Sequence, residues 1–217
     1  MDIIKQFGDS FVSKWQQFVA DEQLSEKQAQ QFAQYMILLR QANEQMSLTT
    51  ITKPENIIAH HFRDSLSLGK FTNLTKEAGL CDVGSGGGFP GIALKIKYPH
   101  LKLFLIEVNQ KKIRFLRQVL QELGLKGCEV YPYDWRTFLR NTDFSIDFFC
   151  ARASLQPEEL LRMFKPSSPY KNAKLVYWAS ELWEPSDKVA PFVQRQEPYK
   201  IKRKKRKLVF LESSLPQ

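Results

Sequence analysis

The fold of this chain is decided by the stretch Leu80-Cys81-Asp82-Val83-Gly84-Ser85-Gly86-Gly87-Gly88-Phe89-Pro90-Gly91. It begins as a short apolar run with one acid, typical of a buried strand, and five glycines follow within eight positions. Glycines let backbone N–H groups approach a ligand where a Cβ would collide, and Pro90 suits the first turn of a following helix. The spacing Asp82-x-Gly84-x-Gly86-x-Gly88 is that of enzymes that bind S-adenosylmethionine.

The same glycines also satisfy a dinucleotide fingerprint, Gly86-x-Gly88-x-x-Gly91. That fingerprint starts where the strand ends, whereas this strand ends near Val83 and Gly86 lies inside the turn. Pro90 removes an N–H that a pyrophosphate requires, and the absence of Gly-Lys-Ser/Thr excludes a P-loop. A plain glycine-rich connection accounts for two glycines better than for five. We therefore favour the S-adenosylmethionine turn.

A second strand is predicted at Leu101–Ile106, and it ends in Glu107. An acid about twenty residues beyond the glycines is placed to hold the hydroxyls of a ribose, although it could also simply mark the strand end. Asn109 caps the next helix, and Gly124 stops it. This order predicts a right-handed βαβα unit, and hence an α/β, Rossmann-like fold with a mostly parallel sheet and helices on both faces.

Helices are expected to precede the sheet, as an extension over residues 1–72 that packs on a core formed by residues 73–217. A helix is predicted from Glu55 to Leu68. His60, His61 and Asp64 on it suggest a metal or acid–base site, but no third ligand follows at ligand spacing, so we interpret them as surface and packing residues and expect no metal. Further strands are predicted at 128–131, 146–150 and 174–178. A closing antiparallel pair, 199–201 and 208–211, flanks a basic turn within a hairpin at about 199–211.

Length and composition indicate a soluble globular protein. The chain has 217 residues, 43% of them apolar, with no secretory leader pattern and no apolar stretch that approaches a membrane span, so we expect a cytoplasmic location. Its three cysteines are far apart in the sequence. Their spacing is not that of a zinc site or of a disulfide framework, so we predict that they are reduced thiols in the core.

The net charge of +9 is concentrated, because seven of the eight residues from Lys200 to Lys207 are basic. Such a single-sign block favours contact with phosphates. A solvated loop or a localisation tag is the competing interpretation. We predict that the block binds RNA through Lys202, Arg203, Lys204, Lys205, Arg206 and Lys207.

Several motifs occur together in the order expected of one family: Leu48-Thr49, His60–Leu66, Asp82–Gly91, Lys112–Leu116 and Ala151-Arg152-Ala153. The chain thereby resembles the bacterial small-subunit rRNA guanine-N7 methyltransferases, also called glucose-inhibited division protein B. The resemblance implies a methyltransferase domain over 73–217 that transfers a methyl group from S-adenosylmethionine to N7 of a guanine in the decoding-region hairpin of 16S ribosomal RNA. The implied partner is 16S rRNA or the small ribosomal subunit, and we expect a monomer.

The resemblance also implies cofactor contacts at Gly84, Phe89, Trp135, Arg136 and Arg152, with Glu107 matching the family's acid. Together with the turn, the predicted cofactor-binding residues are Asp82, Gly84, Gly86, Gly88, Phe89, Glu107, Trp135, Arg136 and Arg152. Arg152 is the predicted catalytic residue, in a positioning role. A core tryptophan and a surface ion pair are the alternatives for Trp135 and Arg152. The chain departs from the family pattern at Ser47, Ala179-Ser180 and Pro166–Pro169, which bear on RNA contact and on the rim of the site.

Methylation of guanine N7 is compatible with the absence of two motifs that other methyl transfers require. Guanine N7 carries a free lone pair, so methyl transfer to it needs positioning and electrostatics but no general base. An Asn/Asp-Pro-Pro-aromatic motif for exocyclic amines and a Pro-Cys nucleophile for carbon-5 are both absent. Two alternatives stay open: a methyltransferase for another RNA or a protein, and a non-catalytic, cofactor-responsive RNA-binding module.

Overall fold

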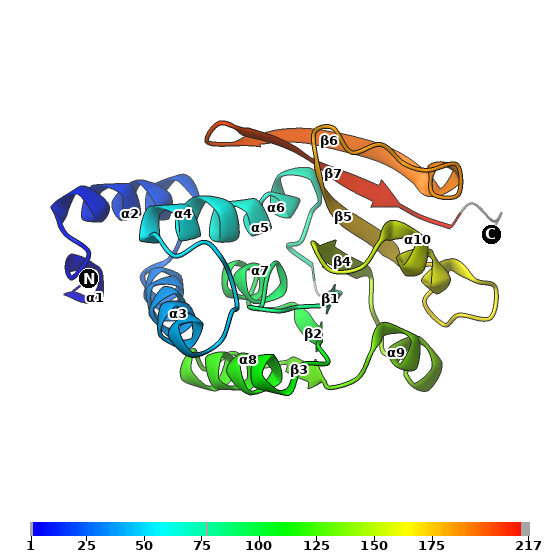
Figure 1. Ribbon diagram of the computed structural model, residues 1–217, viewed down its shortest axis with the longest axis horizontal. Coiled ribbons are helices and arrows are strands. Elements are labelled where there is room, and N and C mark those ends of the chain that lie inside the picture. The colour runs from blue at the N-terminus through cyan, green and yellow to red at the C-terminus, as the bar shows by residue number, and fades with distance from the viewer. Residues whose placement is uncertain (1, 77, 214–217) are drawn as a thin grey trace.

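The computed structural model describes residues 2–76 and 78–213, and its centre is a seven-stranded sheet in the order β3-β2-β1-β4-β5-β7-β6 (Figure 1). Five strands run parallel: β1 (Gly79–Val83), β2 (Lys102–Ile106), β3 (Cys128–Tyr131), β4 (Phe148–Arg152) and β5 (Lys174–Ser180). At one edge, β7 (Lys204–Leu211) and β6 (Val193–Ile201) complete the sheet antiparallel. The predicted α/β fold with a mostly parallel sheet is confirmed.

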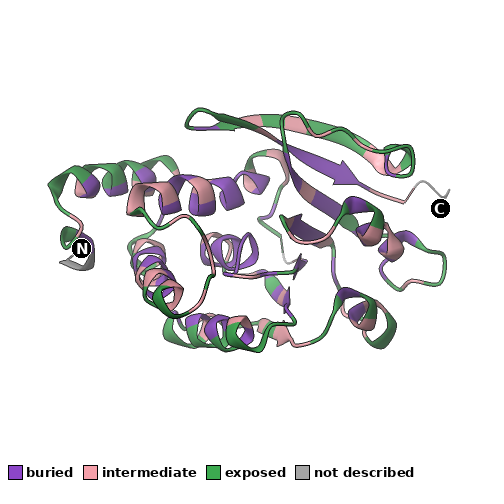
Figure 2. Ribbon diagram, viewed as in Figure 1, coloured by how far each residue is buried: buried purple, intermediate pink, exposed green. Residues whose placement is uncertain are grey.

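Helices cover both faces of the sheet, because alternate residues of a strand point to opposite sides. In β1, Leu80 joins a core cluster with helices α7 (Gly91–Lys97) and α8 (Gln110–Glu122), while Cys81 joins another with α9 (Trp135–Asn141), α10 (Pro157–Leu160) and the 3₁₀ helix η2 (Leu161–Phe164). Figure 2 shows the strands of the parallel sheet largely buried, with the outer helix surfaces exposed. The sheet is thus sandwiched as a parallel sheet requires.

The N-terminal segment is helical: α1 (Asp2–Lys5), α2 (Asp9–Asp21), α3 (Glu26–Gln45), α4 (Pro54–Ile57), a π-helical turn η1 (Ile58–Arg63), α5 (Asp64–Leu66) and α6 (Leu68–Phe71). The helix predicted from Glu55 to Leu68 is present, but it contains the π turn, which sequence periodicity did not reveal. Phe62 on that turn lies 5.9 Å from Phe18 and 4.8 Å from Phe32, ring centre to ring centre. These rings share a core cluster with the sheet, which holds the helices against it.

The C-terminal hairpin differs from its prediction. Both strands are longer than expected, and only Lys202 and Arg203 form the turn between them; Lys204–Lys207 belong to β7. A pattern of consecutive lysines hides the alternation of a strand, so the sequence indicated a long basic turn. The 3₁₀ helix η3 (Ala190–Phe192) leads into β6. Within the described residues, no helix is long and apolar enough to span a membrane.

Candidate functional site

The glycine turn joins the end of β1 to the start of α7. The N–H groups of Gly84 and Ser85 donate to the carbonyl of Ile106, at 2.9 and 3.0 Å, which fixes the turn against β2. Gly84 and Gly86 have φ angles of +70° and +56°. A Cβ on Gly84 would lie 2.5 Å from the Cβ of Ser154, whereas the nearest atom to a Cβ on Gly86 would be 3.9 Å away. Gly86 therefore faces open space, as a ligand-binding turn requires.

Asp82 lies beneath this turn and is fully buried. Its Oδ2 accepts the N–H of Gly91 at 2.8 Å, while its Oδ1 has no hydrogen-bond partner among the described residues. Burial raises the pKa of this carboxyl to about 7. Asp82 lines neither of the cavities described below, so a cofactor contact by it stays a prediction.

Glu107 lies opposite the turn, directly after β2. Its Oε2 accepts the N–H of Gly86 at 2.9 Å, and its Oε1 accepts those of Val108 and Asn109, both at 2.9 Å. A carboxylate offers about four acceptor positions, so one remains after these three bonds. The arrangement fits a carboxylate that also receives a ribose hydroxyl.

A cavity of about 750 Å³ lies beside Glu107, at the carboxyl ends of β1, β2 and β4. We call it the cofactor cavity. One of the residues that line it, Val108, is 58% exposed, which is unusual for an aliphatic residue. It gives the cavity an apolar wall that a base ring would cover. The cavity is lined by Val83, Gly84, Ile106, Glu107, Val108, Lys112, Asp134, Trp135, Arg136, Arg140, Ala153, Ser154, Leu155 and Glu159.

Trp135 and Arg136 both line this cavity, but both side chains already form hydrogen bonds with Glu159. Only 3% of Trp135 is exposed; its ring lies 5.4 Å from that of Phe149, and its indole N–H donates to the carbonyl of Glu159. The guanidinium of Arg136 forms a two-pronged ion pair with the Glu159 carboxylate, at 2.7 and 3.0 Å. The ring of Trp135 packs in the core, and cofactor contacts by Trp135 and by Arg136 stay predictions.

Arg152, the last residue of β4, is held on three sides. One guanidinium nitrogen donates to Asp64 Oδ2 and to the carbonyl of His60, both at 2.9 Å, and the other lies 3.0 Å from Nδ1 of His61. The guanidinium carbon also lies 5.3 Å from the ring centre of Phe89. Arg152 is therefore part of a buried network at the site and no surface ion pair.

Asp64 is the centre of that network, a role that the interpretation of His60, His61 and Asp64 as surface and packing residues did not include. It is fully buried, accepts the Tyr199 hydroxyl at 2.7 Å, and pairs with Arg206 at 3.2 Å as well as with Arg152. Its carbonyl accepts the indole N–H of Trp178. The π turn and the distant strands bring these groups together, so no local spacing signalled them. His61 is buried as well, with 7% of the residue exposed.

Phe89 and Gly88 connect the turn to the N-terminal helices. The ring of Phe89 stacks on His61 at 4.4 Å and on Tyr35 at 5.1 Å. A Cβ on Gly88 would meet the Tyr35 hydroxyl and Ile92 at 2.6 Å. The geometry gives both residues a packing role, and direct cofactor contact by them stays a prediction.

A second cavity, of about 560 Å³, adjoins the cofactor cavity and shares Gly84, Lys112 and Ala153 with it. We call it the acceptor pocket. Ala153 has a φ of +53°, a strained conformation for a residue with a Cβ and one that is enriched at functional sites. The pocket is lined by Asn43, residues 47–51, His60, His61, residues 84–87, Phe89, Lys112, Arg152, Ala153, Lys204 and Arg206.

The basic block is divided by the alternation of β7. Lys204 and Arg206 line the acceptor pocket, whereas Lys205 and Lys207 pair with Glu181 and Glu184, at 3.0 and 3.1 Å. Lys202 in the turn donates to Asn56 of α4, and Figure 1 shows the turn of the hairpin above this helix. Glutamates that are distant in the sequence but close in the structure thus neutralise part of the basic block.

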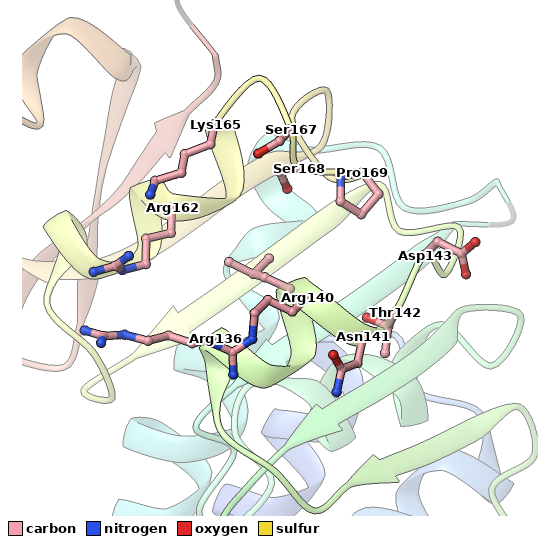
Figure 3. Close-up of a pocket in the computed structure, with 11 residues that line it drawn as sticks. Arg136, Arg140, Asn141, Thr142, Asp143, Arg162, Lys165, Ser167, Ser168 and Pro169 are labelled. Atoms are coloured by element: carbon pink, nitrogen blue, oxygen red, sulfur yellow. The ribbon is translucent and has the colours of Figure 1, made fainter.

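A third cavity, of about 770 Å³, lies beyond α9 and shares Arg136 and Arg140 with the cofactor cavity. Figure 3 shows Arg136, Arg162 and Lys165 extending toward one side of it, with Asp143 at the opposite rim. Glu159 pairs with both Arg136 and Arg162 at 2.7 Å. The segment Ser167–Pro169, part of the departure from the family pattern, forms another wall.

The thiols and metal-ligand residue types of the described chain give no other reactive centre. Burial raises the pKa of Cys81 and of Cys150 well above the usual range, and the thiols of Cys81, Cys128 and Cys150 are free. Residues 2–76 and 78–213 contain no group of His, Cys, Asp and Glu arranged to hold a metal ion.

Comparison with known proteins gives the family. The model of the family described as "rRNA small subunit methyltransferase G" matches residues 28–204. The chain belongs to this family. A member from Geobacillus sp. (strain WCH70), named "Ribosomal RNA small subunit methyltransferase G", is 39% identical over 145 residues, which is 66% of this chain and 61% of that protein. A member of the same name from Exiguobacterium sibiricum is 36% identical over 168 residues, 75% of this chain and 71% of that protein.

The match to the Geobacillus member thus spans less than two thirds of that relative's length. Solved structures support the fold of the methyltransferase G family member described here. A "SAM dependent methyltransferase from Aquifex aeolicus" superposes with a TM-score of 0.53 at 18% identity, covering 80% of this chain and 98% of that one. M. capricolum TrmK, solved with S-adenosyl-homocysteine, gives 0.53 at 15% identity, covering 70% and 68%.

Proposed function

We propose that this chain transfers a methyl group from S-adenosylmethionine to N7 of a guanine in the decoding-region hairpin of 16S ribosomal RNA. Membership of the methyltransferase G family supports the reaction class and the RNA. The observation that carries the proposal is the meeting of the cofactor cavity and the acceptor pocket at Gly84 and Ala153. A cofactor in one cavity and a base in the other would be neighbours at that point.

The residues of the cofactor cavity fit this cofactor. Glu107 has one acceptor position left for a ribose hydroxyl, Gly86 presents no Cβ toward the open space, and Val108 offers an exposed apolar wall. S-adenosylmethionine supplies an electrophilic methyl group on a sulfonium when it is bound. The buried carboxyl of Asp82 lies beneath the turn, where its negative form would favour a cation.

The acceptor pocket suits a nucleophile that needs no deprotonation. Burial and the charge of Arg152 lower the pKa of His61 to about 3, so this ring stays neutral at physiological pH and does not change its protonation state there. N7 brings its own lone pair, so the pocket has to orient the base and exclude alternatives. Arg152 is the positioning residue, because Asp64, His61 and Phe89 fix it at the wall of the acceptor pocket, next to Ala153, which lines both cavities.

The RNA is proposed to lie over the hairpin and the acceptor pocket. Lys204 reaches the pocket from β7, and Arg203 in the turn is exposed. We propose a cytoplasmic, monomeric enzyme. The monomer is supported by the small number of exposed large apolar side chains among the described residues, which are Val108, Tyr133 and Leu182.

The experiment supplies labelled S-adenosylmethionine together with small-subunit RNA, large-subunit RNA, transfer RNA or bulk protein. RNA digestion and chromatography identify the methylated nucleoside. The proposal expects label in small-subunit RNA as N7-methylguanosine. Label in another RNA or in protein would favour a different substrate, and cofactor binding without any transfer would favour a non-catalytic binding module.

A further inference from the structure

Thr49 lies on the segment between α3 and α4 and is half-buried at the wall of the acceptor pocket. Its backbone N–H donates to the side-chain oxygen of Asn43 at 2.9 Å, which fixes the position of the residue. Its hydroxyl oxygen lies 2.8 Å from Nε2 of His61 and 3.0 Å from the backbone nitrogen of Ile51. The direction of these bonds determines what the hydroxyl hydrogen can do.

Arg152 determines the tautomer of His61. A guanidinium donates and never accepts, so the nitrogen of Arg152 that lies 3.0 Å from Nδ1 of His61 donates to it. Nδ1 is then the acceptor of the neutral ring, and the ring hydrogen is on Nε2. That hydrogen points to Thr49 at 2.8 Å, so the Thr49 oxygen accepts it.

The Thr49 oxygen thus accepts two hydrogen bonds, from His61 Nε2–H and from the N–H of Ile51. A hydroxyl has two lone pairs and one hydrogen. Both lone pairs are used, and no acceptor for the hydrogen is found among residues 2–76 and 78–213. The hydroxyl of Thr49 is therefore an oriented donor at the pocket wall, with its direction fixed by its own two acceptor bonds.

We propose that Thr49 donates this hydrogen to O6 of the target guanine and so selects guanine over adenine. The inference rests on the proposed function. When N7 faces the methyl group, the adjacent atom on the same edge of guanine is the acceptor O6, whereas adenine presents an N6 amino donor there. A second donor facing the Thr49 hydroxyl would leave both groups unpaired, which a desolvated pocket penalises.

The test is a cycle between a protein change and a base change. The RNA carries guanine or 2-aminopurine at the methylated position; 2-aminopurine lacks O6 and keeps N7. With the unchanged protein, loss of O6 should lower kcat/KM about 10-fold. Thr49→Val should lower kcat/KM on guanine about 10-fold and then show no further loss on 2-aminopurine. Thr49→Ser, which keeps the hydroxyl, should retain the preference for guanine.

Thr52→Val is the matched control, since this exposed threonine is close in sequence and does not line the acceptor pocket. It should behave as the unchanged protein. A merely structural role for Thr49 would lower the rates on both bases equally and leave the O6 effect at about 10-fold, which would overturn the inference alone. Absence of N7 transfer by the unchanged protein would overturn the proposed function and the inference together.

Discussion

At the scale of single residues, Glu107 shows how one carboxylate organises a ligand site before any ligand binds. It gathers the N–H groups of Gly86, Val108 and Asn109, and so holds the glycine turn against the start of α8. Only 7% of the residue is exposed. The acceptor position that remains is directed by three bonds already formed, so a ribose hydroxyl meets a preorganised partner.

Glu107→Gln should weaken binding of S-adenosylmethionine by about 1.5–3 kcal/mol, which is the usual value of a hydrogen bond to a charged group. The amide keeps the size of the side chain but replaces one acceptor oxygen with a donor. Calorimetry measures the affinity. Glu122→Gln, at the exposed end of α8, is the matched control and should bind normally. Equal affinity for both variants would remove Glu107 from the ribose site.

Asp82 predicts a pH dependence of stability. Its pKa is about 7 in the folded protein against 3.8 as its ordinary value, because burial penalises the charged carboxylate. The folded state therefore binds a proton that the unfolded chain has released, so the contribution of this carboxyl is present below about pH 4 and is lost as the pH rises through about 7. Asp82→Asn removes the titration. Denaturant unfolding at about pH 5 and pH 8 measures the free energy of unfolding of both proteins. The stability of the variant relative to the unchanged protein should increase from the lower to the higher pH. A difference in stability that does not depend on pH would contradict this.

At the scale of elements, the hairpin of β6 and β7 sorts its charges by strand alternation. Lys204 faces the acceptor pocket, and Lys205, the next residue, faces Glu181 on the other side of the strand. Neighbours in the sequence thus have different surroundings. RNA over the pocket would contact one side of the hairpin, and the opposite side is already neutralised.

Lys204→Gln should weaken RNA binding and lower its salt slope by about 0.7–0.9, the value of one phosphate contact. Lys205→Gln, the same change one residue away, should have a smaller effect. Filter binding at several salt concentrations gives both slopes, and calorimetry checks that cofactor affinity is unchanged. If Lys205→Gln lowered the salt slope of RNA binding as much as Lys204→Gln, RNA would contact both sides of β7.

The structural features that could be predicted from the sequence are those specified by residues close together in the chain. The strand, glycine turn and helix around Asp82–Gly91 and the helix cap at Asn109 are where the pattern placed them, because each depends on residues within a few positions. The Asp64 network was missed because its partners Arg152, Trp178 and Tyr199 are 88, 114 and 135 residues away. Only the sheet order and the π turn bring them together.

At the scale of the whole molecule, Asp64 ties the N-terminal helices to the sheet. It contacts side chains from β4, β5, β6 and β7 while lying at the end of the π turn. The same contacts hold Arg152 at the wall of the acceptor pocket, next to Ala153, which lines both cavities. Stability and site geometry therefore depend on one buried carboxylate.

Asp64→Ala should lower the free energy of unfolding by about 3–5 kcal/mol, since it leaves the buried guanidinium of Arg152 without its carboxylate. The control is Asp21→Ala, which breaks the exposed pair with Arg63 and should cost about 0–1 kcal/mol. Urea unfolding measures both. Similar losses for the two variants would show that the Asp64 network does not hold the helices to the sheet.

We propose that this chain methylates guanine N7 at one place in the small-subunit RNA. The most direct measurement uses 16S rRNA from cells that lack the enzyme, incubates it with S-adenosylmethionine and the protein, and maps N7-methylguanine by borohydride and aniline cleavage. Gly86→Val, whose side chain would fill the open space at the turn, is the inactive control. We expect a single new cleavage in the decoding-region hairpin with the unchanged protein and none with Gly86→Val. Cleavage elsewhere, or none despite cofactor binding, would contradict it.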